Sequence, residues 1–142
     1  MSDHVVGAPD SLPAGFEQAD GRLKVRAKRL GGDLVVTFGQ CHHNGAVLLI
    51  GTDSGIPMKF HNQSTWRELD IWVNRLGMDP MDTIRAATYW PAVAMKVDKD
   101  YGTIQAGKYA DIIAVKGDVL RYINLLQRVD VVVKHGKVVK GG

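Results

Sequence analysis

The chain has 142 residues, of which 45% are hydrophobic and 23% charged, with a formal net charge of +3. This composition is typical of a globular domain with a hydrophobic core, and it excludes a disordered tail, a collagen and a coiled coil. No apolar run approaches the roughly 20 residues that a membrane span needs. The first ten residues show no secretory signal, and the single cysteine, Cys41, excludes an internal disulfide framework. We therefore expect a cytoplasmic protein without a membrane partner.

The first 45 residues predict two helices. Ser11-Leu12-Pro13 is typical of a helix start, and Gly31-Gly32 ends the apolar periodicity that follows it. Asp33 can cap a second helix, which Asn44-Gly45 stops.

Basic residues are concentrated within the first of these helices. Five of the eight residues from Arg22 to Arg29 are lysine or arginine, and they lie between apolar positions at helical spacing. This pattern favours a solvated helix face. A nucleic-acid interface needs a larger positive charge or interleaved aromatic residues, so no nucleic-acid partner is expected and such binding is the weakest alternative.

A buried strand is predicted next. Ala46 to Ile50 is continuously apolar, which suits a strand of a parallel sheet that is covered on both faces. The small, polar turn Gly51 to Gly55 follows it, and functional residues gather at such strand ends in α/β proteins. Asp53 is therefore a candidate functional residue, and the alternative is an aspartate that only caps the turn. Because a parallel strand needs partners, we expect missing chain or a second chain.

Helices are predicted again after this turn. Thr65 and Glu68 have the spacing of a capping box, and the helix after them carries Trp72 on its apolar stripe until Gly77 closes it. Asp79-Pro80 begins another helix, which Trp90-Pro91 interrupts.

The last third of the chain predicts short strands. Tyr109 to Val115 is one, and Asp130 to Val133 and Lys137 to Val139 are two more. Lys134-His135-Gly136 between the last two is typical of a hairpin turn.

Four segments in this order resemble the C-terminal part of the metal-dependent amidohydrolase superfamily. They are Gly51 to Gly55 with His61 beyond it, Asp79 to Thr88 followed by Pro91-Ala92, Gly102 to Asp111 running into Ile112 to Val115, and Val131 to Val139. The branch that the chain resembles most includes imidazolonepropionase-like and Xaa-Pro-dipeptidase-like enzymes.

The resemblance implies an α/β fold, a distorted (β/α)8 barrel with a small β-sandwich built from both chain ends. Ala46 to Asp53 would be the eighth barrel strand. Residues 1–100 would form the C-terminal piece of an incomplete barrel, and residues 101–142 the C-terminal strands of the sandwich.

The resemblance also implies a chemistry, the hydrolysis of amide or cyclic amide C–N bonds by water activated on one or two divalent metals, with zinc expected. Such a metal lowers the pKa of its bound water to about 7, and a neighbouring carboxylate can take the proton. Asp53 would be this base and a metal ligand, and His61 would contact the substrate. The alternative for His61 is a loop histidine exposed to solvent.

Most of the family's metal ligands have no counterpart here. The five histidines include no His-x-His pair, and a complete barrel needs about 250 residues. Cys41-His42-His43 could be a metal cluster, but adjacent helix side chains diverge by about 100°, so His42 and His43 cannot easily share a metal. Ordinary helix residues are the favoured interpretation. We expect a fragment that is inactive alone and holds no metal by itself, with a complementing barrel chain or further copies as partners. The alternative is a small non-catalytic binding or assembly protein that self-associates.

Overall fold

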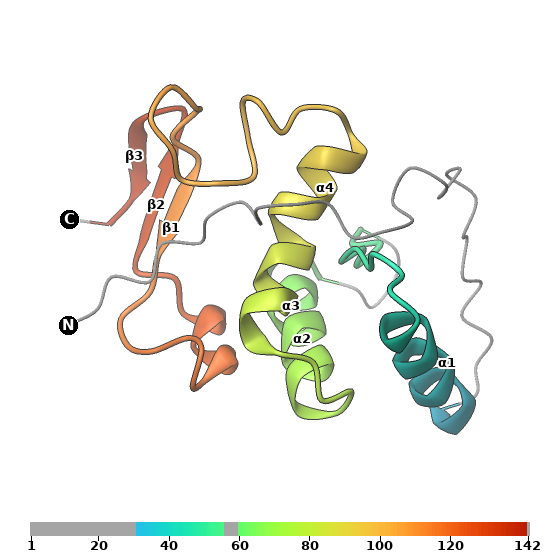
Figure 1. Ribbon diagram of the computed structural model, residues 1–142. Helices are drawn as coiled ribbons and strands as arrows, with labels where there is room; N and C mark the ends of the chain where they lie inside the picture. Colours follow the sequence, from blue (N-terminus) through green and yellow to red (C-terminus); the bar gives the residue numbers. More distant parts are fainter. Residues whose placement is uncertain (1–30, 56–59, 142) are drawn as a thin grey trace. The chain divides into compact units, whose positions relative to one another are not determined.

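The computed structural model describes residues 31–55 and 60–141 (Figure 1). The helix predicted from Ser11 and the basic segment Arg22 to Arg29 lie outside these residues. The described residues divide into two compact units, one ending at Leu48 and one beginning at Leu49. None of the helices within the described ranges has the length and apolar character that a membrane crossing requires.

The first unit contains helix α1, Gly31–His43. Asp33 lies inside this helix as its third described residue, so the prediction that it caps the helix is wrong. The helix that Gly31-Gly32 was predicted to end lies outside the described residues. The predicted stop is confirmed. Gly45 has a φ of 80°, and the amides of Gly45 and Ala46 donate to the carbonyls of His42 and Cys41 at 3.0 and 2.9 Å. This pair of bonds is the Schellman ending that a left-handed glycine permits.

The predicted strand at Ala46 to Ile50 is not formed. These residues have no regular secondary structure, and Leu49 is 42% exposed. The amide of Ile50 instead donates to the carbonyl of Ala86 at 3.0 Å. A parallel strand exists only through neighbours on both sides, and apolar composition alone cannot supply them.

The second unit contains three helices, α2 (His61–Asn74), α3 (Pro80–Ala87) and α4 (Tyr89–Ala94). Helix α2 begins four residues before Thr65, so the predicted capping box is wrong and both of its residues lie inside the helix. The predicted start of α3 is confirmed, since Asp79 Oδ1 accepts from the amides of Met81 and Asp82 at 2.8 and 3.1 Å.

The predicted break at Trp90-Pro91 lies instead at Thr88, which has a φ of −128° and a ψ of −71°. Pro91 is the third residue of α4. In the first turn of a helix an amide has no intrahelical acceptor, so proline costs little there.

The core of this unit forms where α2 packs against α3 and against the 3₁₀ helix η2 (Ile123–Gln127). Trp72 is 6% exposed, as its position on the apolar stripe predicted. Thr83 is fully buried, and its hydroxyl donates to the carbonyl of Asp79 at 2.9 Å, which satisfies the buried polar group. The other buried side chains are Leu69, Met78, Ala86, Ala92 and Ile123.

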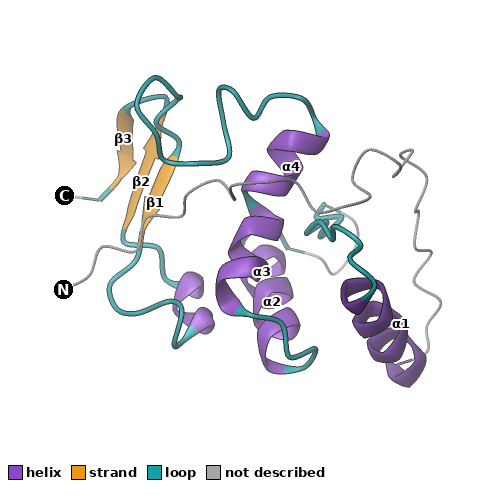
Figure 2. Cartoon of the chain, in the orientation of Figure 1, coloured by secondary structure: helices purple, strands orange, loops and turns teal. Residues whose placement is uncertain are grey.

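Three strands form one antiparallel sheet in the order β1-β2-β3 (Figure 2). They are β1 (Ile112–Ala114), β2 (Val131–Lys134) and β3 (Lys137–Lys140). The hairpin prediction is confirmed: Lys134 pairs with Lys137, and the two turn residues His135 and Gly136 have φ values of 47° and 75°, as a type I′ turn requires. The first strand is shorter than the predicted 109–115.

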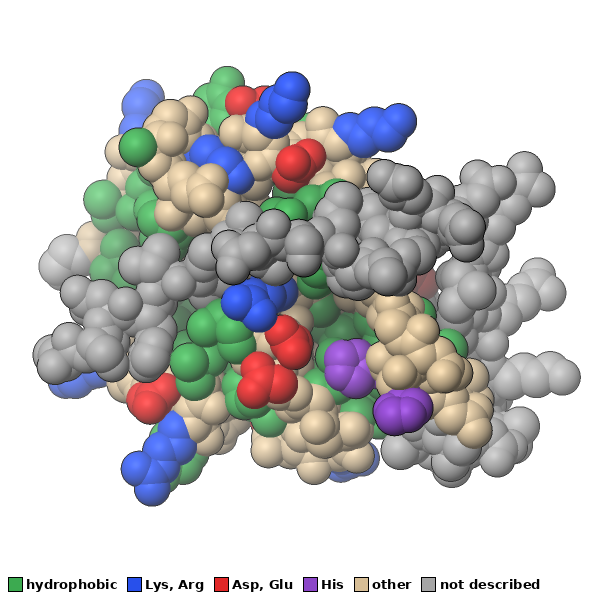
Figure 3. Space-filling model, in the orientation of Figure 1, with side chains coloured by type: hydrophobic (Ala, Val, Ile, Leu, Met, Phe, Trp, Pro, Cys, Tyr) green, Lys and Arg blue, Asp and Glu red, His purple; other side chains and the backbone are tan. Residues whose placement is uncertain are grey.

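Apolar side chains of this sheet reach the surface (Figure 3). Ile113, Val138 and Val139 are 53%, 62% and 63% exposed. A sheet usually buries at least one face against another layer. The described residues therefore leave this sheet open.

The loop between α4 and β1 is closed by Lys108, whose ammonium group donates to the Asp98 carbonyl and, at 2.6 Å, to the Thr103 hydroxyl. Within this loop, Gly102 lies against α4 with a φ of 88°.

We predict that Gly102→Ala destabilises the fold more than Gly107→Ala by about 2 kcal/mol. Both residues have a left-handed φ, 88° and 89°, which costs any side chain about 1–2 kcal/mol. A Cβ at Gly102 would also lie 2.7 Å from Ala92 Cβ and 3.0 Å from the Thr88 carbonyl oxygen, whereas a Cβ at Gly107 meets nothing within 4 Å. Urea unfolding of the two variants measures the difference, and equal losses would contradict the packing of this loop on α4.

A second prediction concerns the ion pair of Asp111 with Lys134. The hydrogen bond from Lys134, followed by that from the His135 amide at 2.7 Å, lowers the pKa of Asp111 below its usual 3.8. A lowered pKa stabilises the fold above pH 3.8, and this contribution disappears as the pH falls through the lowered value. We therefore expect the melting temperature of wild type to exceed that of Asp111→Asn at pH 6. The difference between the two melting temperatures should narrow as the pH falls below 3.8, and a difference that does not change with pH would contradict the lowered pKa.

Candidate functional site

The candidate site is the turn Gly51 to Gly55, which two helices hold at its start. The Ile50 amide donates to the Ala86 carbonyl of α3 at 3.0 Å, and the Gly51 amide donates to Glu68 Oε1 of α2 at 3.3 Å. The carbonyl of Ala86 is available because it lies in the last turn of α3, where carbonyls lack intrahelical donors.

Asp53 lies at the centre of this turn with an exposed side chain. Its φ is 51°, in the left-handed region that residues other than glycine rarely adopt, although aspartate tolerates it better than most. The hydroxyls of its neighbours Thr52 and Ser54 are hydrogen-bonded to each other at 2.7 Å. Strained residues that present a polar side chain cluster at functional sites, so this backbone supports the prediction that Asp53 is functional.

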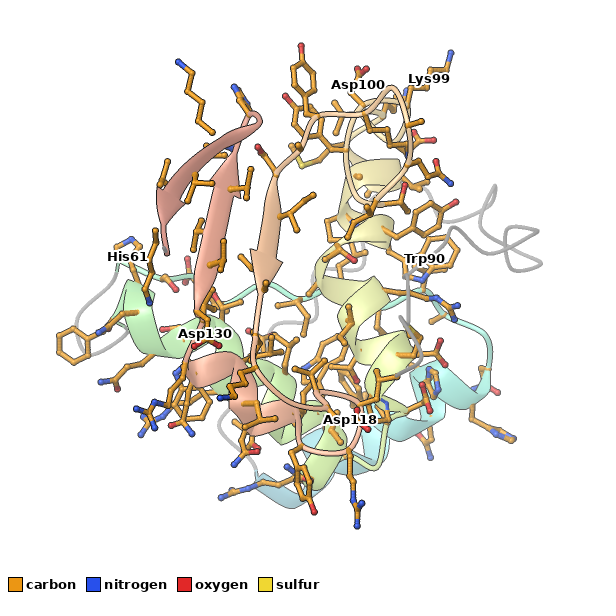
Figure 4. All side chains as sticks on the ribbon, turned by 90° about the vertical axis from the view of Figure 1, so that its left-hand side faces the viewer. His61, Trp90, Lys99, Asp100, Asp118 and Asp130 are labelled. Atoms are coloured by element: carbon orange, nitrogen blue, oxygen red, sulfur yellow. The ribbon has the colours of Figure 1, made fainter. Side chains whose placement is uncertain are left out.

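His61 lies close to the other end of the same turn. It is the first residue of α2, and its side chain is exposed, as Figure 4 shows at the start of that helix. A Cβ added at Gly55 would lie 3.4 Å from His61 Cε1 and 3.5 Å from Nε2. The imidazole therefore lies beside Gly55, two residues from Asp53, and the structure brings both predicted site residues to one turn.

The residues present do not make a metal centre. Across residues 31–55 and 60–141, no three His, Cys, Asp or Glu side chains are grouped so that they could hold a metal ion. A catalytic zinc needs about three protein ligands, and Asp53 with His61 would supply two. The described residues by themselves therefore do not fit the metal that the resemblance implies.

The hydrogen bond between Glu68 and the Gly51 amide was not predicted from the sequence. The sequence suggested local capping, but the carboxylate contacts a residue 17 positions away. A signal was present: Glu68 precedes the buried Trp72 by one helical turn, so both lie on one face of α2. A carboxylate at the edge of a buried helix face needs a polar partner.

We predict that Asp53→Ala destabilises the chain by about 1 kcal/mol and that Asp53→Asn changes stability by much less. Alanine has no side chain to stabilise a left-handed backbone, whereas asparagine tolerates it as well as aspartate. Urea unfolding of both variants gives the two values. Equal stability of Asp53→Ala and wild type would mean that this residue is not held in the left-handed region.

The chain is similar to several amidohydrolases. The model of the Amidohydrolase family matches residues 26–139. The crystal structure of a Xaa-Pro dipeptidase with methionine bound in its active site matches with a TM-score of 0.70 and 34% identity, over 80% of this chain and 27% of that one. Ochratoxinase from A. niger matches with a TM-score of 0.66 and 28% identity, over 76% and 25% of the two chains. No curated protein is significantly similar in sequence.

Molinate hydrolase is a further structural relative, with a TM-score of 0.65 and 25% identity over 71% of this chain and 25% of its own. The chain thus spans about a quarter of the length of each of these enzymes. The resemblance of the four sequence segments is confirmed, and most of the chain lies within the matched region. This chain belongs to the amidohydrolase family.

Proposed function

We propose that the chain supplies part of the active site of a metal-dependent amidohydrolase that hydrolyses amide or cyclic amide C–N bonds of small molecules. The observation that carries this proposal is the family match over residues 26–139, which includes the turn with the exposed, strained Asp53. Hydrolases among the structural relatives, such as the Xaa-Pro dipeptidase and molinate hydrolase, support the reaction class. A cytoplasmic location is part of the same proposal.

Within such an enzyme, residues 1–100 form the last piece of a (β/α)8 barrel and residues 101–142 form sandwich strands. The order of the described elements supports this division, because α1 to α4 precede residue 100 and β1 to β3 follow it. Ala46 to Asp53 becomes a barrel strand only when neighbouring strands pair with it. The parts of the relatives that this chain does not match are the source of those neighbours.

Asp53 is proposed as a metal ligand and as the base that takes a proton in the reaction, and His61 as a substrate contact. The exposure of both side chains and the position of His61 beside Gly55 support these roles. The remaining ligands of the expected zinc must come from outside the described residues, either from a complementing barrel chain or from further copies.

A second candidate function is that of a non-catalytic protein that self-associates. The exposed apolar residues of the sheet favour it, since exposed apolar surface promotes association. Native mass spectrometry of the purified chain, which reports oligomeric mass and bound metal, separates the two proposals when it is combined with a hydrolysis assay and a thermal melt. A metal-free chain without hydrolytic activity fits a partial active site, whereas a cooperatively melting, metal-free oligomer fits the assembly protein. A defined oligomer with stoichiometric zinc and hydrolytic activity would contradict the expected inactivity of the chain alone.

We predict that a chimera restores hydrolysis. Residues 26–139 replace the matching quarter of the Xaa-Pro dipeptidase relative, and turnover of an Xaa-Pro dipeptide is measured. Asp53→Asn should lower kcat at least about 100-fold, because loss of a positioned base typically costs that much. Asp100→Asn, which changes an exposed aspartate of the α4–β1 loop, should leave kcat unchanged. A chimera that turns over equally well with Asp53→Asn would exclude the proposed role of Asp53.

A further inference from the structure

We infer that Glu68 is a positioning residue, whose carboxylate holds the Gly51 amide and thereby fixes the turn that carries Asp53. The catalytic importance of this role rests on the proposed function. The proposal that Glu68 fixes the conformation of the turn does not rest on it, because it concerns only the hydrogen bond between α2 and Gly51.

Each of the two helices at the start of the turn accepts a hydrogen bond from one backbone amide. Amides of successive residues in an extended segment point to opposite sides. The Ile50 amide is held by Ala86 of α3, and the Gly51 amide is held by Glu68 of α2 at 3.3 Å. The first contact uses a helix carbonyl that any sequence would provide. The second requires a side-chain acceptor of the right length.

The rotation of α2 about its own axis is fixed by the side chains that it buries. Leu69 and Trp72 are 4% and 6% exposed, and the helix packs against α3 and η2. Glu68 precedes Leu69 directly and Trp72 by one turn, so burial of these two side chains sets the direction of its own.

Residues of α2 lie at both ends of the turn. His61 and Glu68 are seven residues apart, which places them on one helix face about 10 Å apart along the axis. His61 lies beside Gly55, and Glu68 accepts from the Gly51 amide. The turn between these contacts contains the left-handed Asp53, and a strained backbone persists only where its surroundings over-determine it. Helix α2 therefore restricts the backbone of this turn from both ends, and we call this its bracing role.

The test uses the isotopically labelled full chain in solution. Amide hydrogen exchange is measured at Gly51, and backbone order parameters are measured for Thr52 and Asp53. In Glu68→Ala we expect exchange at Gly51 to be about tenfold faster and the Asp53 order parameter to fall to about 0.6 or below. Glu68→Gln keeps a side-chain carbonyl at the same distance, so it should retain most of the wild-type values.

The matched control is Asp70→Ala on the same helix, which removes a carboxylate that accepts from Asn74 Nδ2 at 2.8 Å. This variant should leave Gly51 and Asp53 unchanged. If Glu68→Ala does not fold, Glu68→Met replaces it, because methionine keeps the chain length and helix propensity without a strong acceptor. An unchanged Asp53 order parameter in the variant that folds, or equal loosening by Asp70→Ala, would overturn the inference.

The chimera separates this inference from the proposed function. Glu68→Ala should lower kcat there and leave KM unchanged, with Glu68→Gln restoring most of the loss. If Asp53→Asn leaves the chimera active while Glu68→Ala still loosens the turn, the proposed function of Asp53 is wrong and the bracing role of Glu68 stands.

Discussion

The structure around the candidate site depends on one constraint, the need of two consecutive backbone amides for partners. In a complete parallel sheet, neighbouring strands would accept from Ile50 and Gly51. Here the last turn of α3 and a carboxylate on α2 accept instead. These two bonds tie the start of the turn to the two helices. The position of Asp53 therefore follows from how the helices pack.

That packing is itself specified by few side chains. Leu69 and Trp72 are buried on α2, and Thr83 and Ala86 are buried on α3, which packs against α2. The Asp79-Pro80 start sets where α3 begins, and the break at Thr88 sets where it ends, which places the Ala86 carbonyl in a free last turn. The capped start of α3 and its end at Thr88 thus determine where the Ala86 carbonyl lies, and this carbonyl accepts from the amide at the start of the candidate turn. Changes in this core should move the turn even without touching it.

The sequence predicted those features whose cause is local. The N-cap at Asp79 and the left-handed pair His135-Gly136 depend only on neighbouring residues, and both are confirmed. Ala46 to Ile50 was expected to be a strand, but strand formation depends on partners that apolar composition cannot reveal. Glu68 has the spacing of a cap, yet its tertiary contact with Gly51 determines its use. The placement of Asp53 and His61 at one turn followed from a family resemblance rather than from spacing.

The backbone of Asp53 distinguishes the two proposed functions. A protein that only self-associates needs the exposed apolar sheet but gains nothing from a left-handed aspartate in a turn braced at both ends. Glycine would fit that φ of 51° without strain. An amidohydrolase needs a carboxylate in a fixed place, and it can offset the strain with the anchors on α2 and α3. The open sheet and the missing ligands fit both readings, so the conformation of this residue favours the hydrolase.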